Sequence, residues 1–265
     1  MIDEGWKEPV LGFEYESEIV SVTKEFQSEK LDACGLKSEI LKGFVDASFF
    51  IGIGIDTGEK SGISSEGNVN MLTSLIQHRP VRLGEPLTAK GIITGVSEVP
   101  RGQAIKTDVW FEDEMGNRAI SAARMSLRPK AEKSTKRGAG LRPTPVITEP
   151  DKLNRFETYI LTPECVKAYS SEGNSIHYEM DAANSAGFRA PIIGGGMGVH
   201  YLIQTLWKRS RVEAFDLSIY FRRPIFWDDT FVVAADKWNA IALLREGSPE
   251  TKVLTEARIN HLSPA

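Results

Sequence analysis

Cysteine is scarce in this chain, whose 265 residues include only Cys34 and Cys165. The two lie far apart and form no C-x-x-C pair, which argues against a disulfide scaffold and against a zinc ribbon. No H-x-x-x-H pair is present either, so we expect no metal site. Reduced thiols are typical of the cytoplasm, and we expect a cytoplasmic protein.

Long apolar runs and a surplus of basic charge are also missing. The longest apolar stretch, FVDASFFIGIGI, is too short to span a bilayer and contains Asp46. The acidic and polar start, MIDEGWKEPV, does not have the pattern of a secretory signal peptide. The formal net charge is −4, which gives no broad basic surface for nucleic acid. We therefore expect no nucleic-acid partner and no membrane partner.

The sequence contains a weak internal repeat. HRPVRLGEPLTAKG, which begins at His78, can be laid over RRPIFWDDTFVVAA, which begins at Arg222. Upstream, YESEIVSVTKEF resembles FETYILTPECV, with Thr23 on Thr162. Both matches occur in the same order and at nearly the same offset, which indicates a duplicated unit.

Each half has the same coarse pattern. A first strand is followed by a short helix that begins near Thr23 or Thr162. An apolar helix with glycines comes next, and alternating strands come after it. The clearest strand patterns are those of residues 85–99, 104–114, 118–129, 212–226, 230–238 and 252–260. The pattern predicts an α+β fold in which each unit wraps a curved antiparallel sheet around one central helix.

A segment rich in Lys, Gly and Pro separates the halves and is typical of a linker. We expect an N-terminal unit at residues 1–130, a linker at 131–150 and a C-terminal unit at 151–265. A long helix of the second unit should begin near Gly195.

One stretch, SSEGNSIHYEMDAANSAGFRAPIIGGGMG from Ser170 to Gly198, gathers chemically useful residues. His177 can accept and donate a proton near neutral pH, and the nearby Glu172 could orient it or handle a second proton. Taken singly, each residue is more commonly structural, the histidine buried against a backbone carbonyl and the glutamate a solvated surface charge. Asn174 lies between the two and is a common loop residue.

Three glycines, Gly194, Gly195 and Gly196, lead into a predicted helix, MGVHYLIQTLWKR. Glycine costs about 1 kcal/mol in a helix relative to alanine, so the triplet needs a reason. A bare backbone allows the helix to pack closely on the sheet, or it leaves free N–H groups open to a ligand oxyanion. His200, further along this helix, is expected to be packed or on the surface rather than in a pocket.

The stretch resembles the motif of the MaoC-like (R)-specific enoyl-CoA hydratases and dehydratases, which adopt the hot-dog fold. That motif reads approximately S-G-D-x-N-P-x-H-x-D-x-x-x-A-x-x-x-G-F-x-x-P-I-A-H-G-M. The residues that agree with it are Asn174, His177, Ala183, Gly187, Phe188, Pro191, Ile192 and Gly195. Glu172 stands where the family has a catalytic Asp, Ser175 where it has Pro, and Gly194 where it has a second His. The order of elements fits a double hot-dog arrangement whose N-terminal unit lacks the motif.

The resemblance implies a lyase that hydrates a 2-enoyl thioester or dehydrates a (3R)-hydroxyacyl thioester. Glu172 and His177 would then be catalytic, and a backbone N–H at Gly195 would stabilise the enolate. Asn174, Gly194 and Gly196 would contact the substrate, which would be an acyl-CoA or acyl carrier protein thioester. No cofactor would be needed. The chain would form a pseudo-dimer by itself, with a homodimer left open.

Two other functions stay open. One is a hot-dog acyl-CoA thioesterase, which would direct water at the carbonyl carbon. The other is a non-catalytic acyl-binding or partner subunit with a degenerate site. Activity on short enoyl-CoAs separates the lyase from the second of these, and release of free thiol identifies a thioesterase.

Overall fold

The structure, a computed structural model, describes residues 5–130, 143–170, 174–209, 211–247 and 250–264. Its α-helices are α1 (Lys24–Ala33), α2 (Phe49–Lys60), α3 (Pro163–Ser170), α4 (Met180–Ser185) and α5 (Gly195–Arg209). Short 3-10 helices are η1 (Ser38–Leu41), η2 (Pro150–Lys152) and η3 (Ser175–His177). The strands are β1 (Glu18–Val20), β2 (Val69–Gln77), β3 (Leu87–Val99), β4 (Gly102–Glu112), β5 (Arg118–Pro129), β6 (Asn154–Ile160), β7 (Val212–Phe221), β8 (Thr230–Asp236), β9 (Ala240–Arg245) and β10 (Lys252–Pro264).

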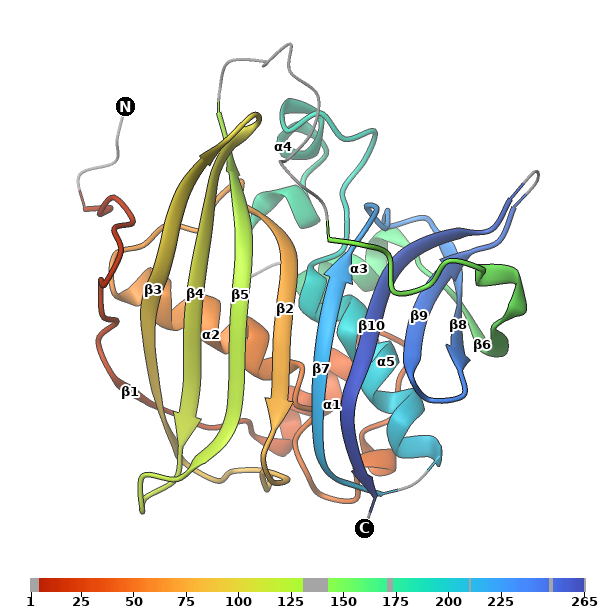
Figure 1. The fold of residues 1–265 in the computed structure, drawn as a ribbon, viewed down its shortest axis with the longest axis horizontal. Coiled ribbons are helices and arrows are strands. Elements are labelled where there is room, and N and C mark those ends of the chain that lie inside the picture. The colour runs from red at the N-terminus through yellow and green to blue at the C-terminus, as the bar shows by residue number, and fades with distance from the viewer. Residues whose placement is uncertain (1–4, 131–142, 171–173, 210, 248–249, 265) are drawn as a thin grey trace.

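The strands of the described ranges form one antiparallel sheet in the order β1-β3-β4-β5-β2-β7-β10-β9-β8-β6. When β6 to β10 are matched to β1 to β5 in chain order, the second half of this order is the reverse of the first. This is the pattern expected of two copies of one unit related by a pseudo-twofold axis. The sheet curves around α2 and α5, which lie on the same side of it (Figure 1). The predicted α+β fold of two duplicated units is therefore confirmed, and α5 begins at Gly195 as predicted.

The linker prediction falls largely outside the described residues, because positions 131–142 are not among them. The unit boundaries at 130 and 150 therefore stay predictions.

The first helix of each unit begins as the sequence predicts. The hydroxyl of Thr23 accepts a hydrogen bond from the backbone N–H of Phe26 at 3.2 Å. In the second unit the hydroxyl of Thr162 accepts one from the N–H of Cys165 at 3.3 Å, and Pro163 is the first residue of α3. These caps satisfy backbone donors that a helix leaves unpaired.

The two units share one hydrophobic core. Leu75 of β2 lies directly opposite Leu217 of β7, and both side chains are fully buried. Tyr201 of α5 reaches into the N-terminal unit, where its hydroxyl donates a hydrogen bond of 3.0 Å to the carbonyl of Cys34. Because apolar contacts and hydrogen bonds cross between the units, we expect them to unfold together.

Two strands were not among those predicted. In β2 the buried positions include the polar Thr73 and Gln77, which hide the alternation of apolar and polar residues. In β9 five of six residues are buried, so no alternation exists at all. Such a short apolar run cannot be told from other buried segments by its periodicity.

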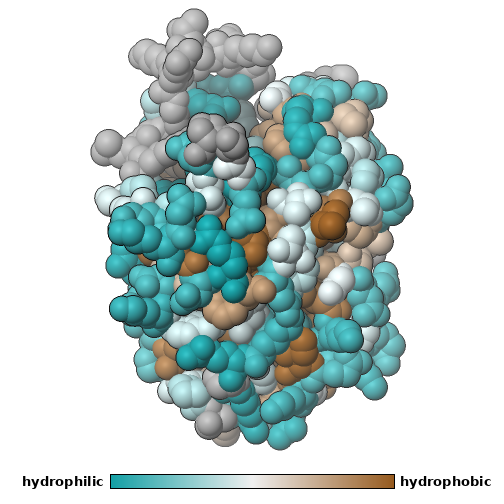
Figure 2. Space-filling model, turned by 90° about the vertical axis from the view of Figure 1, so that its right-hand side faces the viewer, coloured by the Kyte–Doolittle hydropathy of each residue, from teal (hydrophilic) through white to brown (hydrophobic). Residues whose placement is uncertain are grey.

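The end of the sheet formed by β6 is open to solvent. Phe156 and Ile160 of this strand are exposed. The face of the molecule in Figure 2 is mostly hydrophilic, and its hydrophobic residues are scattered in small separate groups. No single large apolar patch is visible on this face.

None of the helices in the described ranges is long and apolar enough to cross a membrane. The same ranges contain no cluster of three or more His, Cys, Asp or Glu side chains able to hold a metal ion.

We predict that Leu217→Ala destabilises the whole chain by about 2–5 kcal/mol, since a buried leucine is replaced by a cavity at the seam of the units. Urea denaturation followed by fluorescence and by circular dichroism measures this cost. The two probes should report one transition at the same midpoint. Ile160→Ala, at an exposed edge position, is the control and should change stability little. Separate transitions for the two units would contradict a shared core.

Candidate active site

A cavity of about 490 Å³ lies between the two units. The N-terminal unit contributes α2, β2 and β5 to its wall, while the C-terminal unit contributes η3, the start of α5 and the end of β7. His177, Gly194, Gly195 and Gly196 all line this one cavity. The structure therefore brings together the histidine and the glycines that the sequence singled out.

His177 is held in a defined tautomer. Its Nδ1 lies 2.8 Å from the carbonyl oxygen of Ile192. A carbonyl can only accept, so Nδ1 carries the proton, and in the neutral ring Nε2 is an acceptor that has no donor among the described residues. Burial lowers the pKa of His177, while the Ile192 carbonyl and the carboxylate of Glu66 oppose this shift. The imidazole is thus kept neutral, with a basic nitrogen facing the cavity.

Asn174 supports the turn that carries His177. Its side-chain oxygen caps η3 by accepting a hydrogen bond of 3.3 Å from the N–H of Ile176. Its amide nitrogen lies 3.5 Å from the carbonyl oxygens of Ser65 and Asn68 in the N-terminal unit. Asn174 also lines the cavity, so contact with a substrate stays a prediction beside this positioning role.

The glycines at the start of α5 differ from one another. A Cβ at Gly195 would meet the ring of Phe221 at 2.9 Å, so close packing explains this glycine. A Cβ at Gly194 would lie 3.5 Å from Nε2 of His177 and 3.8 Å from Cδ2 and Cε1, so it would pack on the face of the imidazole ring beside the basic nitrogen. Among the described residues, the N–H groups of Gly195 and Gly196 have no acceptor. Both explanations from the sequence therefore apply, close packing at one glycine and open N–H groups at the helix start.

Glu172 lies in residues 171–173, outside the described residues. Its flanking residues Ser170 and Asn174 both line the cavity. The role of Glu172 stays a prediction.

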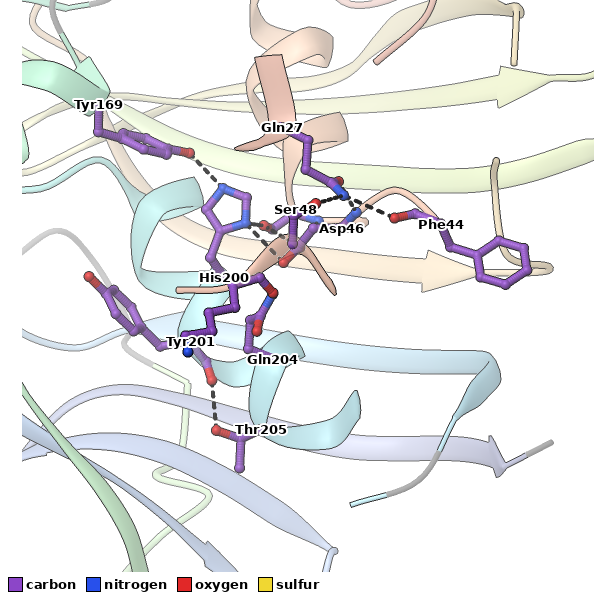
Figure 3. A network of polar contacts seen from close by, with 11 residues as sticks. Gln27, Phe44, Asp46, Ser48, Tyr169, His200, Tyr201, Gln204 and Thr205 are labelled. Atoms are coloured by element: carbon purple, nitrogen blue, oxygen red, sulfur yellow. Dashed lines mark hydrogen bonds and ion pairs between the residues drawn. The ribbon is translucent and has the colours of Figure 1, made fainter. Parts of the chain in front are cut away.

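His200 is packed, as expected, but it is also the centre of a buried polar network that joins the units (Figure 3). Its Nδ1 contacts the hydroxyl of Ser48 and lies 3.1 Å from a carboxylate oxygen of Asp46. Its Nε2 lies 2.8 Å from the hydroxyl of Tyr169, the second-to-last residue of α3. Asp46 and Ser48 directly precede α2, so the network ties the start of α2 to α5 and α3.

The protons of this network can be assigned. The Ser48 hydroxyl donates its only proton to Asp46 at 2.8 Å, so it accepts from Nδ1 of His200. In the neutral ring Nε2 then accepts from the Tyr169 hydroxyl. Burial raises the pKa of Tyr169 well above its ordinary value, so the phenol keeps its proton. Gln27 completes the network by accepting from the backbone N–H of Asp46 at 2.8 Å.

Sequence reasoning missed every cavity residue of the N-terminal unit. Ser48, Asn70 and Arg124 line the cavity, but none belongs to a motif. The one sequence feature that pointed to a buried polar network was Asp46 within an apolar stretch, because a buried carboxylate needs a partner. Nothing in the sequence identified that partner as His200, 154 positions away in the other unit, or placed Tyr169 beside it.

We predict that Tyr169→Phe lowers stability by about 1–3 kcal/mol, because Nε2 of buried His200 loses its hydrogen-bond donor. Chemical denaturation measures the change. Tyr159→Phe is the matched control, since the Tyr159 hydroxyl contacts the exposed Glu157 and its loss should cost less. Equal costs for the two variants would show that the His200 network contributes no special stability.

No family model matches the sequence, and no curated protein matches it significantly. Solved structures do match the fold. HtdX from Mycobacterium tuberculosis superposes with a TM-score of 0.73 at 16% identity, over 92% of this chain and 98% of that one. A MaoC-like dehydratase from Phytophthora capsici gives a TM-score of 0.67 at 16% identity, over 94% and 96% of the two chains.

Two further solved structures match the fold with lower TM-scores. A conserved hypothetical protein of Mycobacterium tuberculosis, described as having a double hot-dog fold, gives a TM-score of 0.64 at 13% identity, over 97% and 98%. A protein from Lactobacillus plantarum, provisionally named an oleoyl thioesterase, gives 0.57 at 13% identity, over 94% and 95%. At these identities the likeness concerns the backbone alone, and the chain has the double hot-dog fold that these structures share.

Proposed function

We propose that this protein is a lyase that adds water to a 2-enoyl thioester, or removes it from a (3R)-hydroxyacyl thioester. The observation that carries the proposal is the position of His177, whose free Nε2 faces the same cavity as the open N–H groups of Gly195 and Gly196. The reaction requires an acceptor that holds the attacking water and donors that stabilise the oxyanion. The resemblance of residues 170–198 to the MaoC-like motif and the likeness of the fold to a MaoC-like dehydratase support the same activity.

The proposed hydration uses one water held between Glu172 and His177. The water oxygen adds to C3 while one of its protons passes to the acid–base pair. The electrons of the double bond move toward the thioester carbonyl, whose oxygen becomes an oxyanion. The N–H groups at the start of α5 stabilise that charge, helped by the positive end of the helix dipole. A proton from the pair then reaches C2, and dehydration follows the same steps in reverse.

Glu172 stands where the family has an aspartate, and in our proposal it and His177 have different roles. The neutral His177, with its proton fixed on Nδ1, orients the water through Nε2. Glu172 is then the group that exchanges protons with water and with C2. One additional methylene moves a carboxylate by about 1 Å, which matters for rate unless the site is built around it.

A thioesterase is the second candidate, since the fold is shared with the provisionally named oleoyl thioesterase. That reaction would direct the water at the carbonyl carbon rather than at C3. An assay on a panel of enoyl- and 3-hydroxyacyl-CoAs tests both candidates, because a thioesterase releases free thiol and a lyase does not. Inertness on every thioester, with acyl-CoA binding retained, would support a non-catalytic acyl-binding subunit.

We predict that His177→Ala lowers kcat by roughly 10²-fold or more, because the attacking water loses the acceptor that orients it. Glu172→Gln should also be severe, because it keeps the shape of the side chain and removes its proton chemistry. Glu172→Asp should lower activity if the site is built around the longer side chain. Steady-state kinetics on an enoyl-CoA measures all three. Higher turnover in Glu172→Asp would instead indicate that the glutamate is a substitution that lowered the activity of the site.

We predict that Gly194→Ala lowers kcat/KM by roughly 10²-fold, because the added methyl group packs on the ring of His177, 3.5 Å from Nε2, and narrows the space for the substrate and the reacting water beside it. Thermal stability should change little, since the methyl group meets no atom closer than 3.5 Å. Gly198→Ala is the control, because its Cβ would also make only ordinary contacts but lies one turn further along α5. Full activity of Gly194→Ala would place the reacting water elsewhere.

A further inference from the structure

Arg124 lies where a hydrophobic core residue is expected. On β5, Ile120 and Ala122 point into the core, and Arg124 follows them on the same face of the strand. Its side chain lines the cavity and is half-buried. An arginine remains charged in proteins, so this position puts a cation inside the cavity wall.

The guanidinium of Arg124 makes no hydrogen bond or ion pair with the described residues. Glu59 of α2 is near enough to raise its pKa, and so is Tyr15, but burial lowers it more. The Glu59 carboxylate is instead engaged by Ser65, through the backbone N–H at 3.3 Å and through the hydroxyl. The N–H donors of the guanidinium therefore have no acceptor among the described residues, and their planar arrangement matches the two oxygens of a carboxylate.

A chain of contacts connects Arg124 to the start of α5. The side-chain amide of Asn70 would lie 3.4 Å from a Cβ on Gly195 and donates to the hydroxyl of Thr73 at 3.0 Å. Thr73 is directly opposite Arg124 in the pairing of β2 with β5. Since opposite residues share a face and have Cβ atoms about 5 Å apart, Arg124 is within reach of an acyl group whose carbonyl lies at Gly195.

The wall around Arg124 is polar in other respects. The side-chain oxygens of Asn68 and Asn70 are buried and have no hydrogen-bond donor in the part of the chain that the structure describes. Both residues line the cavity. A purely aliphatic acyl group would leave these oxygens and the guanidinium unpaired in a dry site, at a cost for each.

We propose that the acyl group of the substrate carries a second carboxylate, which Arg124 binds. The substrates would be short dicarboxylyl thioesters, with the thioester carbonyl at the start of α5 and the distal carboxylate on β5. This inference rests on the proposed function, because it places the carbonyl beside His177.

The phosphates of a thioester carrier are the other possible anion. Exposed arginines, Arg101 and Arg223, also line the cavity and mark its solvent-facing parts. A carrier phosphate remains hydrated and is expected there. Arg124 is on the inner face of the sheet, which favours the carboxylate of the acyl group.

The test compares 2-pentenedioyl-CoA with 2-pentenoyl-CoA, which have the same chain length and differ in the terminal carboxylate. We expect a kcat/KM at least about 10-fold higher for the dicarboxylyl substrate. Arg124→Met should lower that value by about 10–100-fold and leave 2-pentenoyl-CoA nearly unaffected. Arg124→Lys, which keeps the charge, should retain part of the preference. Arg128→Met on the same strand is the control, because Arg128 pairs with the exposed Glu8.

Binding of saturated analogues separates this inference from the proposed function. Calorimetry with pentanedioyl-CoA, pentanoyl-CoA and free CoA needs no turnover. Tighter binding of pentanedioyl-CoA, lost in Arg124→Met, would support the carboxylate site even in a protein that hydrates nothing. Equal use and equal binding of the two acyl groups would overturn it and leave the lyase intact. Weaker binding of free CoA by Arg124→Met would assign the arginine to a carrier phosphate and also overturn it.

Discussion

The pairing of β2 with β7 is the interaction on which the rest of the molecule depends. These two strands join the sheets of both units edge to edge, with six residue pairs in register from Leu72–Tyr220 to Gln77–Phe215. Because the sheet is continuous, α2 and α5 are covered by one curved surface and share one core (Figure 1). The cavity exists because the wall from β2 and β5 faces the start of α5 across this seam.

A second constraint fixes the helices relative to each other. A buried carboxylate and a buried imidazole are each costly when left alone, and the Ser48 hydroxyl joins Asp46 to His200 across the units. The Tyr169 hydroxyl extends the network to the end of α3, only a few residues before His177. The position of the proposed catalytic segment is therefore coupled to the start of α2. The network thus fixes the geometry around the segment proposed to be catalytic.

The sequence predicted what is encoded locally. The capping threonines, the long alternating strands and the start of α5 depend on neighbours within a few positions, so their residues identify them. The motif around His177 and the glycines was found for the same reason. By contrast, Asn70 and Arg124 acquire their importance only through strand pairing and through packing of one unit against the other. An arginine in an alternating strand resembles any surface arginine until the sheet is assembled, and Tyr169 resembles any helical tyrosine until His200 is placed beside it.

The duplication has a consequence for how such a protein can change. In a symmetric dimer of single hot-dog units, every substitution appears twice, so a residue that improves one wall of a site also alters the equivalent wall of the other. Here the two units are one chain, and the segment before α2 differs freely from the segment before α5. One unit carries the histidine and the glycines before its central helix, while the other carries Asp46 and Ser48 at the corresponding helix start. Because the two copies can differ, the segment before α2 can supply the buried polar network while the segment before α5 supplies the proposed site.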